Sequence, residues 1–398
     1  MKLTKKTDII KKSDLTDEMK LLLAIIQDEI VDEQFSEYSL DDFDWDHFLY
    51  LAIHHRVYPL IYRNIKSINS ISIPEHVINT IQSKYKKNVF MMLQLTAEQE
   101  IIAKAFAHDE IKSIFLKGPV LAADLYGDIS LRTSKDIDIY VQQNDLNKIN
   151  ELLANLGYVK EEHPFILNEK IWRTHHEEYY HLEKNICLEV HWKLHNNFLI
   201  EPSFGELWKN RRTSKLSNTP IHILGKEDLF IYLVSHGARH AWARIRWLVD
   251  IDKMIRDNSM DWVKIQSIAR DLKYRDLLGQ SLVLTNILLS TPILKIINAD
   301  SLIQKKEIKK LVEMALVFIK EYKGTQSFPG DELRKLHYYY TFSMQNNFSQ
   351  KCKYIRSLLR PTMKDAKVLQ LPKQFQFLYF PLRPFFIVGR SLGIIKNE

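Results

Sequence analysis

Two acidic residues two positions apart are the first candidates for chemistry in this chain of 398 residues. Asp136 and Asp138 stand in the alternating run Asp-Ile-Asp-Ile-Tyr-Val over residues 136–141. Because side chains alternate across a strand, both carboxylates are expected on one face, with Ile137, Ile139 and Val141 in the core. Carboxylates this close repel each other unless a cation lies between them, and Mg²⁺ is commonly bound by one or two carboxylates plus substrate phosphates. The run predicts a divalent metal site, for Mg²⁺ or Mn²⁺.

A third acid stands in a later run of the same kind. Apolar and polar residues alternate over residues 186–193, so Glu189 is a polar residue on a strand with a buried face. If this strand neighbours residues 136–141, three acids converge as metal ligands and catalytic residues: Asp136, Asp138 and Glu189. Two metal ions about 3.5–4 Å apart could then activate an attacking oxygen and stabilise a leaving pyrophosphate.

A turn upstream of these acids is a candidate for binding phosphate. The apolar run 111–116 ends at Lys117-Gly118-Pro119. A strand that ends in glycine before a helix start offers free backbone N–H groups to a triphosphate. Lys117 and Arg132 could add charge-assisted contacts, with ordinary surface ion pairs as the alternative for both side chains.

The elements that must position these residues follow from hydrophobic period and turn signals. We expect strands at 111–116 and 136–141, a short helix at 120–126, a helix at about 145–156, and a hairpin of 178–182 with 186–194. Helices are expected before this unit, with Thr16 as a cap, from Pro74, and around 96–107. They return after it from Lys226, where Gly237 interrupts, from Asp261-Trp262, and over 282–289. The expected domains are 1–95 helical, 96–205 catalytic, 206–335 helical, and 336–398 a basic and aromatic tail packed on the body.

These residues resemble the uncharacterised nucleotidyltransferase family of the DNA-polymerase-β-like superfamily. The resemblance lies in 115–118 (Phe-Leu-Lys-Gly), Leu125-Tyr126, Arg132, 134–139 (Ser-Lys-Asp-Ile-Asp-Ile) and 188–192 (Leu-Glu-Val-His-Trp). Further similar stretches are 56–60 (Arg-Val-Tyr-Pro-Leu), 227–229, and a C-terminal set of residues: His236, His240, Trp242, Arg244, Trp247, Leu248, Asp250, Asp261 and Trp262. The resemblance implies an α+β fold with a mixed-sheet core between helical regions, metal chemistry, and neighbours among polysaccharide and peptide natural-product genes.

Two groups of histidines invite a zinc interpretation. His236 and His240 share a helix face, but Gly237 stands where a zinc-peptidase helix carries glutamate, and nearby arginines favour anions. We expect His236, His240 and Arg244 to contact phosphate or base, with histidines packed between domains as the alternative. The second group is expected to line a strand edge without binding metal: His175, His176 and His181.

Composition limits the class of protein. Hydrophobic residues are 45% and charged residues 26%, as in ordinary globular domains, and the net charge of +7 lacks the basic track of a template-directed polymerase. Cys187 and Cys352 match no zinc spacing and suggest a reducing compartment. No apolar run is long enough to span a bilayer, so we expect a cytoplasmic protein. The aromatic tail is expected to dock on its own protein rather than on a membrane.

The sequence therefore predicts a Mg²⁺-dependent enzyme that moves a nucleoside monophosphate from an NTP to a hydroxyl or phosphate of a small-molecule or peptide acceptor, without a nucleic-acid template. One alternative is a metal-dependent glycosyltransferase that uses a nucleotide sugar for peptide tailoring. Another is a non-catalytic nucleotide-binding module. We expect Asp138→Asn to abolish turnover with little loss of stability.

Overall fold

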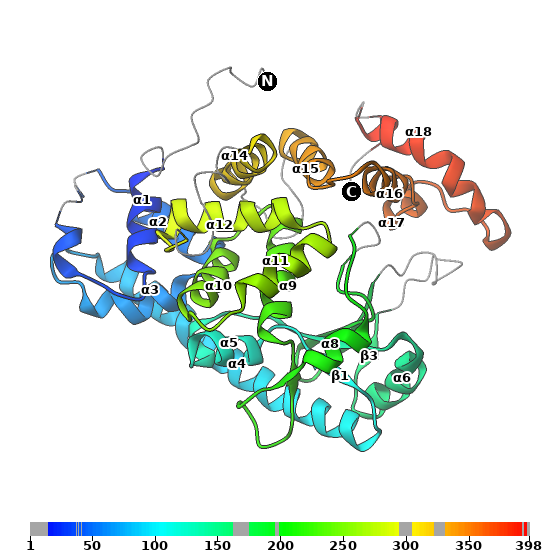
Figure 1. The fold of residues 1–398 in the computed structure, drawn as a ribbon, viewed down its shortest axis with the longest axis horizontal. Helices are drawn as coiled ribbons and strands as arrows, with labels where there is room; N and C mark the ends of the chain where they lie inside the picture. The colour runs from blue at the N-terminus through cyan, green and yellow to red at the C-terminus, as the bar shows by residue number, and fades with distance from the viewer. Residues whose placement is uncertain are drawn as a thin grey trace.

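The structure is a computed structural model that describes residues 15–36, 38, 40, 42–161, 175–195, 199–293, 305–321, 331–391 and 394–395. In the described residues, helices precede and follow a sheet formed by the middle of the chain (Figure 1). This is the α+β architecture that the sequence predicts. No helix in the described ranges is both long enough and apolar enough to cross a membrane.

The N-terminal region is helical, as expected. It contains α1 (Asp17–Ile25), η2 (Asp32–Phe35), α2 (Trp45–His54), α3 (Tyr58–Asn64), η3 (Ile65–Ser67) and α4 (Glu75–His108). The predicted cap of α1 is confirmed, because the Met19 amide donates to Thr16 Oγ1 at 3.3 Å.

Helix α4 corrects one prediction. Separate helices are expected from Pro74 and around residues 96–107, whereas the structure has one helix of 34 residues. No glycine or proline interrupts residues 75–108, so nothing in the backbone chemistry ends the helix between them. At 1.5 Å per residue it is about 51 Å long, and it runs along the bottom of the molecule from the N-terminal helices to the sheet (Figure 1).

The sheet has seven strands in the order β3-β4-β5-β2-β1-β7-β6. The strands are β1 (Ser113–Phe115), β2 (Asp136–Val141), β3 (Val159–Lys160), β4 (His176–His181), β5 (Ile186–His191), β6 (Arg212–Thr213) and β7 (His222–Ile223). Parallel pairs join β2 to β5 and β1 to β7, and the other neighbours are antiparallel. The connecting helices are α5 (Pro119–Tyr126), η4 (Ile129–Leu131), η5 (Gln143–Asp145), α6 (Leu146–Asn155) and α8 (Phe204–Asn210).

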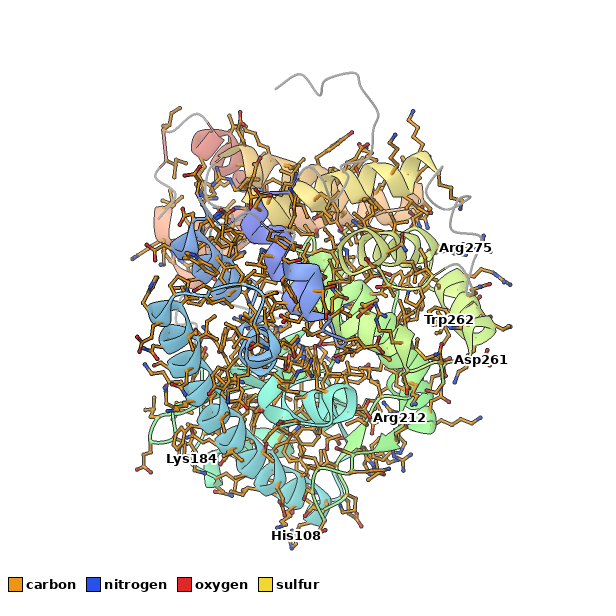
Figure 2. All side chains as sticks on the ribbon, turned by 90° about the vertical axis from the view of Figure 1, so that its left-hand side faces the viewer. His108, Lys184, Arg212, Asp261, Trp262 and Arg275 are labelled. Carbon is orange, nitrogen blue, oxygen red and sulfur yellow. The ribbon has the colours of Figure 1, made fainter. Side chains whose placement is uncertain are left out.

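The two faces of the sheet pack against different groups of helices. Ile137, Ile139 and Val141 of β2 lie in one buried core together with side chains of α4 and α6, as their alternation predicts. Tyr140 points to the opposite face and belongs to the larger core, which contains side chains of the N-terminal helices and of the helices that follow the sheet. The acids of β2 share this second face, so the helices that follow the sheet also cover the candidate site. The turn of the β4–β5 hairpin is held on α4, where Lys184 Nζ lies 2.8 Å from Glu98 Oε2 (Figure 2).

The C-terminal region contains α9 (Lys226–Arg239), α10 (Ile245–Arg256), α11 (Trp262–Asp271), α12 (Arg275–Leu289), α14 (Lys306–Glu321), α15 (Asp331–Ser343), α16 (Phe348–Leu358), α17 (Met363–Val368), η6 (Lys373–Leu378) and α18 (Tyr379–Ser391). Asp261 caps α11 as predicted, accepting from the Lys264 amide at 3.0 Å, and lies at the edge of the molecule (Figure 2). Helix α18 contacts α17 in a small separate core of Ala366, Tyr379 and Phe386.

Gly237 corrects a second prediction, because α9 continues through it. The indole of Trp242 packs directly on Gly237, where a Cβ atom would collide with the ring. The glycine therefore permits a close approach between the end of α9 and the following turn, instead of interrupting the helix.

Candidate active site

The three predicted acids lie on one face of two adjacent parallel strands. In the register of β2 and β5, Asp138 stands opposite Glu189, and Asp136 stands opposite Cys187. Ile186, Leu188 and Val190 point into the core on the other side. The two strands that carry the acids are therefore neighbours, as the prediction of a shared site requires.

Asp138 is the most enclosed of the three acids, with 1% of its surface exposed. Its Oδ1 atom lies 2.8 Å from Lys117 Nζ and 3.2 Å from His191 Nε2. Burial alone would raise the pKa of Asp138, but the Lys117 ammonium and the hydrogen bond from His191 lower it below the usual value. The second oxygen, Oδ2, is buried and has no hydrogen-bond partner among the described residues.

Asp136 and Glu189 are half-buried and complete the acidic group. Ser134 Oγ donates to Asp136 Oδ1 at 3.2 Å, and His191 Nε2 lies 3.1 Å from Glu189 Oε2. Burial, and then repulsion by Asp138, raise the pKa of Asp136. A divalent cation would remove this repulsion and supply the partner that Asp138 Oδ2 lacks, so the residues present fit a metal ion with oxygen ligands.

The predicted glycine turn lies directly beside the acids. Strand β1 ends at Phe115, the Leu116 amide donates to the Asp138 carbonyl at 3.0 Å, and α5 begins at Pro119. Gly118 has φ +78°, a backbone conformation that suits glycine. Its absent Cβ would lie 3.4 Å from the Asp136 carbonyl. The turn therefore passes close to the acidic strand while Lys117 reaches Asp138.

Arg132 lies inside the protein, in contact with the C-terminal helices. Its Nε and Nη2 atoms donate to Asp250 of α10 at 3.0 Å each, and both side chains are almost fully buried. Tyr126 donates to the same carboxylate at 2.7 Å. Three positions of the family resemblance thus form one network that joins α5 and the segment before β2 to α10.

Helix α9 covers the acidic face. His236 and His240 are packed with Trp247, the His240 and Trp247 rings stacking at 5.0 Å between centroids. Burial, and then the nearby Lys117 charge, lower the pKa of His236 well below its usual value. Burial raises the pKa of Tyr232, one turn earlier, to about 12, with Lys117 acting against the rise and Asp138 adding to it.

Several cations lie near Asp136 and near one another, close enough to interact electrostatically. Burial and then repulsion by Arg244 lower the pKa of Arg56 to about 10. Repulsion by Arg56, burial and repulsion by Arg244 lower the pKa of Lys135. Arg246 is repelled by Arg132, Arg56 and Arg244, and it donates to Thr133 Oγ1 at 3.0 Å. Mutual repulsion of this kind favours an anion such as phosphate.

His191 and Arg56 lie near the acids but were not predicted to belong to the site. His191 could have been noticed, because it lies on the same strand two positions after Glu189 and shares its face. Arg56 belongs to a stretch of the family resemblance, but nothing local shows that the loop before α3 lies near β2. Lys135 and Arg246 were likewise not assigned, although both stand beside assigned residues.

Comparison with known proteins gives one match. No curated protein and no solved structure matches the chain. The family model described as uncharacterised nucleotidyltransferase matches residues 41–290, which includes the N-terminal helices from α2, the sheet and the helices from α9 to α12. The chain therefore belongs to the uncharacterised nucleotidyltransferase family, and its general role is that of a nucleotidyltransferase, a transferase enzyme.

Proposed function

We propose that this enzyme uses Mg²⁺ or Mn²⁺ to transfer a nucleoside monophosphate from an NTP to a hydroxyl or phosphate group of a small-molecule or peptide acceptor. The observation that carries this proposal is the register of β2 and β5, which brings Asp136, Asp138 and Glu189 to one face. The buried, unpartnered Asp138 Oδ2 supports the binding of a cation there.

The metal would be held by Asp136, Asp138 and Glu189, and when bound it supplies neutralisation of phosphate charge and polarisation of the reacting oxygens. Lys117 now occupies one oxygen of Asp138, and its ammonium would add to this positive charge. The Gly118 turn and the cations Arg56, Lys135 and Arg244 would orient the triphosphate, so that much of the rate enhancement comes from positioning.

The transfer forms one bond and breaks one bond. An acceptor oxygen attacks the α-phosphorus, and the bond from that phosphorus to the β-phosphate oxygen breaks and releases pyrophosphate. Glu189 is the group that would accept the acceptor proton, directly or through water. His236, His240 and Arg244 would contact the phosphates or the base from the side of α9 and α10, while Arg132 would act by holding Asp250 and the adjoining segment in place.

The experiment is a thermal-shift panel of NTPs and nucleotide sugars, with and without Mg²⁺, on wild type, Asp136→Asn and the control Glu151→Gln. Glu151 is exposed on α6, away from the acidic face. A ligand at about a hundred times its Kd stabilises the folded state by roughly 2.7 kcal/mol. We expect a Mg²⁺-dependent shift with an NTP in wild type and Glu151→Gln that is absent in Asp136→Asn, followed by pyrophosphate release once an acceptor is supplied.

Each other outcome contradicts a part of the proposal. A Mg²⁺-dependent shift with nucleotide sugars alone, with release of a nucleoside diphosphate, would identify a glycosyltransferase. An NTP shift that persists in Asp136→Asn without Mg²⁺ would identify a nucleotide-binding module whose acids hold no metal.

A further inference from the structure

Three histidines gather at one end of the β4–β5 hairpin, next to the acidic group. His175 precedes β4, and His176 stands opposite His191 in the register of the hairpin. One ring nitrogen of each histidine lies within 4.8 Å of those of the other two. His175 Nε2 and His176 Nδ1 lie 3.0 Å apart.

The opposite nitrogens of two of these rings face carboxylates. His176 Nε2 lies 3.3 Å from Glu178 Oε1, and His191 Nε2 lies 3.1 Å from Glu189 Oε2. Histidines that ligate metals usually donate their second N–H to a carboxylate in this way, which orients the ring and leaves the other nitrogen with a lone pair. The arrangement thus leaves Nδ1 as the coordinating atom of both His176 and His191.

The Nδ1 atom of His191 is itself unexplained by protein contacts. His191 is 5% exposed, and this nitrogen is buried without a hydrogen-bond partner among the described residues. An ordinary hydrogen bond between His175 and His176 would account for their 3.0 Å separation, but it leaves the third ring with a buried nitrogen that has no partner among the described residues, which is costly.

The chemistry of the donors selects the class of ligand. In a tetrahedral site with metal–nitrogen distances near 2.0–2.1 Å, two ligand atoms are about 3.3 Å apart, close to the separation of His175 and His176. Imidazole nitrogens suit Zn²⁺ and related transition ions, whereas Mg²⁺ prefers oxygen.

We propose that His175, His176 and His191 form a binding site for a transition-metal ion of the Zn²⁺ class, distinct from the Mg²⁺ site of Asp136, Asp138 and Glu189. Glu178 and Glu189 orient two of its ligands. Because His191 bridges from this site to Glu189 and Asp138, a bound ion would also fix two acids of the neighbouring site. This proposal departs from the expectation that His175 and His176 line a strand edge without binding metal.

The test uses the full chain, stripped of metal with a chelator, and titrates it with Co²⁺ followed by visible absorption. We expect about one Co²⁺ ion with the intense bands of four-coordinate geometry, displaced by Zn²⁺ and not by excess Mg²⁺. His176→Gln should weaken the affinity at least tenfold, and Glu178→Gln, which keeps all three nitrogens, about tenfold. His108→Gln is the matched control, since that histidine is exposed at the far end of α4 (Figure 2).

Asp136→Asn separates this site from the proposed Mg²⁺ site, because it should leave Co²⁺ affinity within twofold of wild type. Circular dichroism identifies variants that fail to fold. If His176→Gln fails to fold, Glu178→Gln still tests the proposal. Absence of Co²⁺ binding in wild type would overturn the proposal. The proposal would also be overturned if Asp136→Asn weakened Co²⁺ binding as much as His176→Gln does. It would likewise be overturned if His176→Gln and Glu178→Gln both folded and bound Co²⁺ with unchanged affinity. The Mg²⁺-dependent NTP shift should persist in His176→Gln, so failure of either proposal is recognised separately.

Discussion

Lys117 Nζ lies 2.8 Å from Asp138 Oδ1, and the two side chains are 16% and 1% exposed. The lysine of the glycine turn is therefore paired with the central acid of β2, rather than with a partner on the surface. This pairing makes the two acids of the motif unequal, because Asp138 has a buried cation while Asp136 is destabilised in its charged form by burial and by Asp138.

Asp136→Asn and Asp138→Asn are expected to have opposite effects on stability. Asparagine at 136 removes a repelled charge, so the metal-free variant should be at least as stable as wild type. Asparagine at 138 removes the carboxylate that is paired with the half-buried Lys117 ammonium, which should cost up to about 3 kcal/mol, contrary to the expectation from sequence. Urea denaturation in chelator measures both, and both variants should lack nucleotidyl transfer. Lys117→Met combined with Asp138→Asn should recover part of the loss; equal stability of the two single variants would show that the pair contributes nothing.

The network of Arg132 and Asp250 should be a major determinant of stability. Arg132→Met and Asp250→Asn each leave one buried group without its partner, at a cost of about 3–5 kcal/mol, and the double variant should lose less than the sum. Tyr126→Phe removes one hydrogen bond to a carboxylate and should cost about 1.5–3 kcal/mol. Equilibrium denaturation gives these values. An Arg132→Met protein with wild-type stability and abolished NTP binding would instead place Arg132 on the phosphates.

Gly237→Ala should destabilise the protein by about 1–3 kcal/mol, because the added methyl group overpacks the interface with Trp242. Gly205→Ala is the matched control, since a Cβ at that position in α8 meets nothing within 4 Å; it should be neutral or stabilise by up to about 1 kcal/mol. Melting temperatures of the two variants decide the question. If both alanines behave alike, Gly237 is not required for close packing.

The contact between Asp28 and Lys253 should make a pH-dependent contribution to the free energy of unfolding. Burial alone would raise the pKa of Asp28, but Lys253 and Arg63 outweigh it and lower the pKa below 3.8. A carboxyl group whose pKa is lower in the folded than in the unfolded state stabilises the folded protein at pH values above the unfolded-state pKa. This stabilisation is lost as the pH falls through the folded-state pKa. Since Asp28 is 41% exposed, Lys253→Met should cost at most about 1 kcal/mol at neutral pH.

The measurement is the melting temperature of wild type and Lys253→Met between about pH 3 and 7. The difference should narrow towards the acidic end, and it should also narrow in high salt because the pair is partly exposed. A difference that is independent of pH would assign the effect to the packing of the lysine stem instead of its charge.

Much of the sheet was predictable because its signals are local. The alternation in residues 136–141 and 186–191 located β2 and β5 and the faces of Asp136, Asp138 and Glu189. The continuity of α4 could also have been predicted, since no glycine or proline stands between residues 75 and 108. These properties depend on backbone conformation and on side chains within a few positions of each other.

The parts that sequence reasoning missed depend on distant partners. Arg132 carries no sign that Asp250, 118 positions later, will occupy its guanidinium group. Arg56 comes near Asp136 only because the loop before α3 packs against the start of α10, where the Ile245 amide donates to His55 Nδ1 at 3.3 Å. A glycine at position 237 looks the same in the sequence whether it ends a helix or makes room for the indole ring of Trp242.

The parallel pairing of β2 with β5 also has a consequence for the order of folding. Asp138 and His191 are 53 positions apart, so the site closes only after a long crossover has been ordered. Pairings of such high sequence separation form slowly, because chain entropy is lost before the contacts repay it. During synthesis the N-terminal helices and β2 leave the ribosome first, and the acids of β2 must await β5. The acidic face is thus expected to form late in folding, although its first residues belong to the first half of the chain.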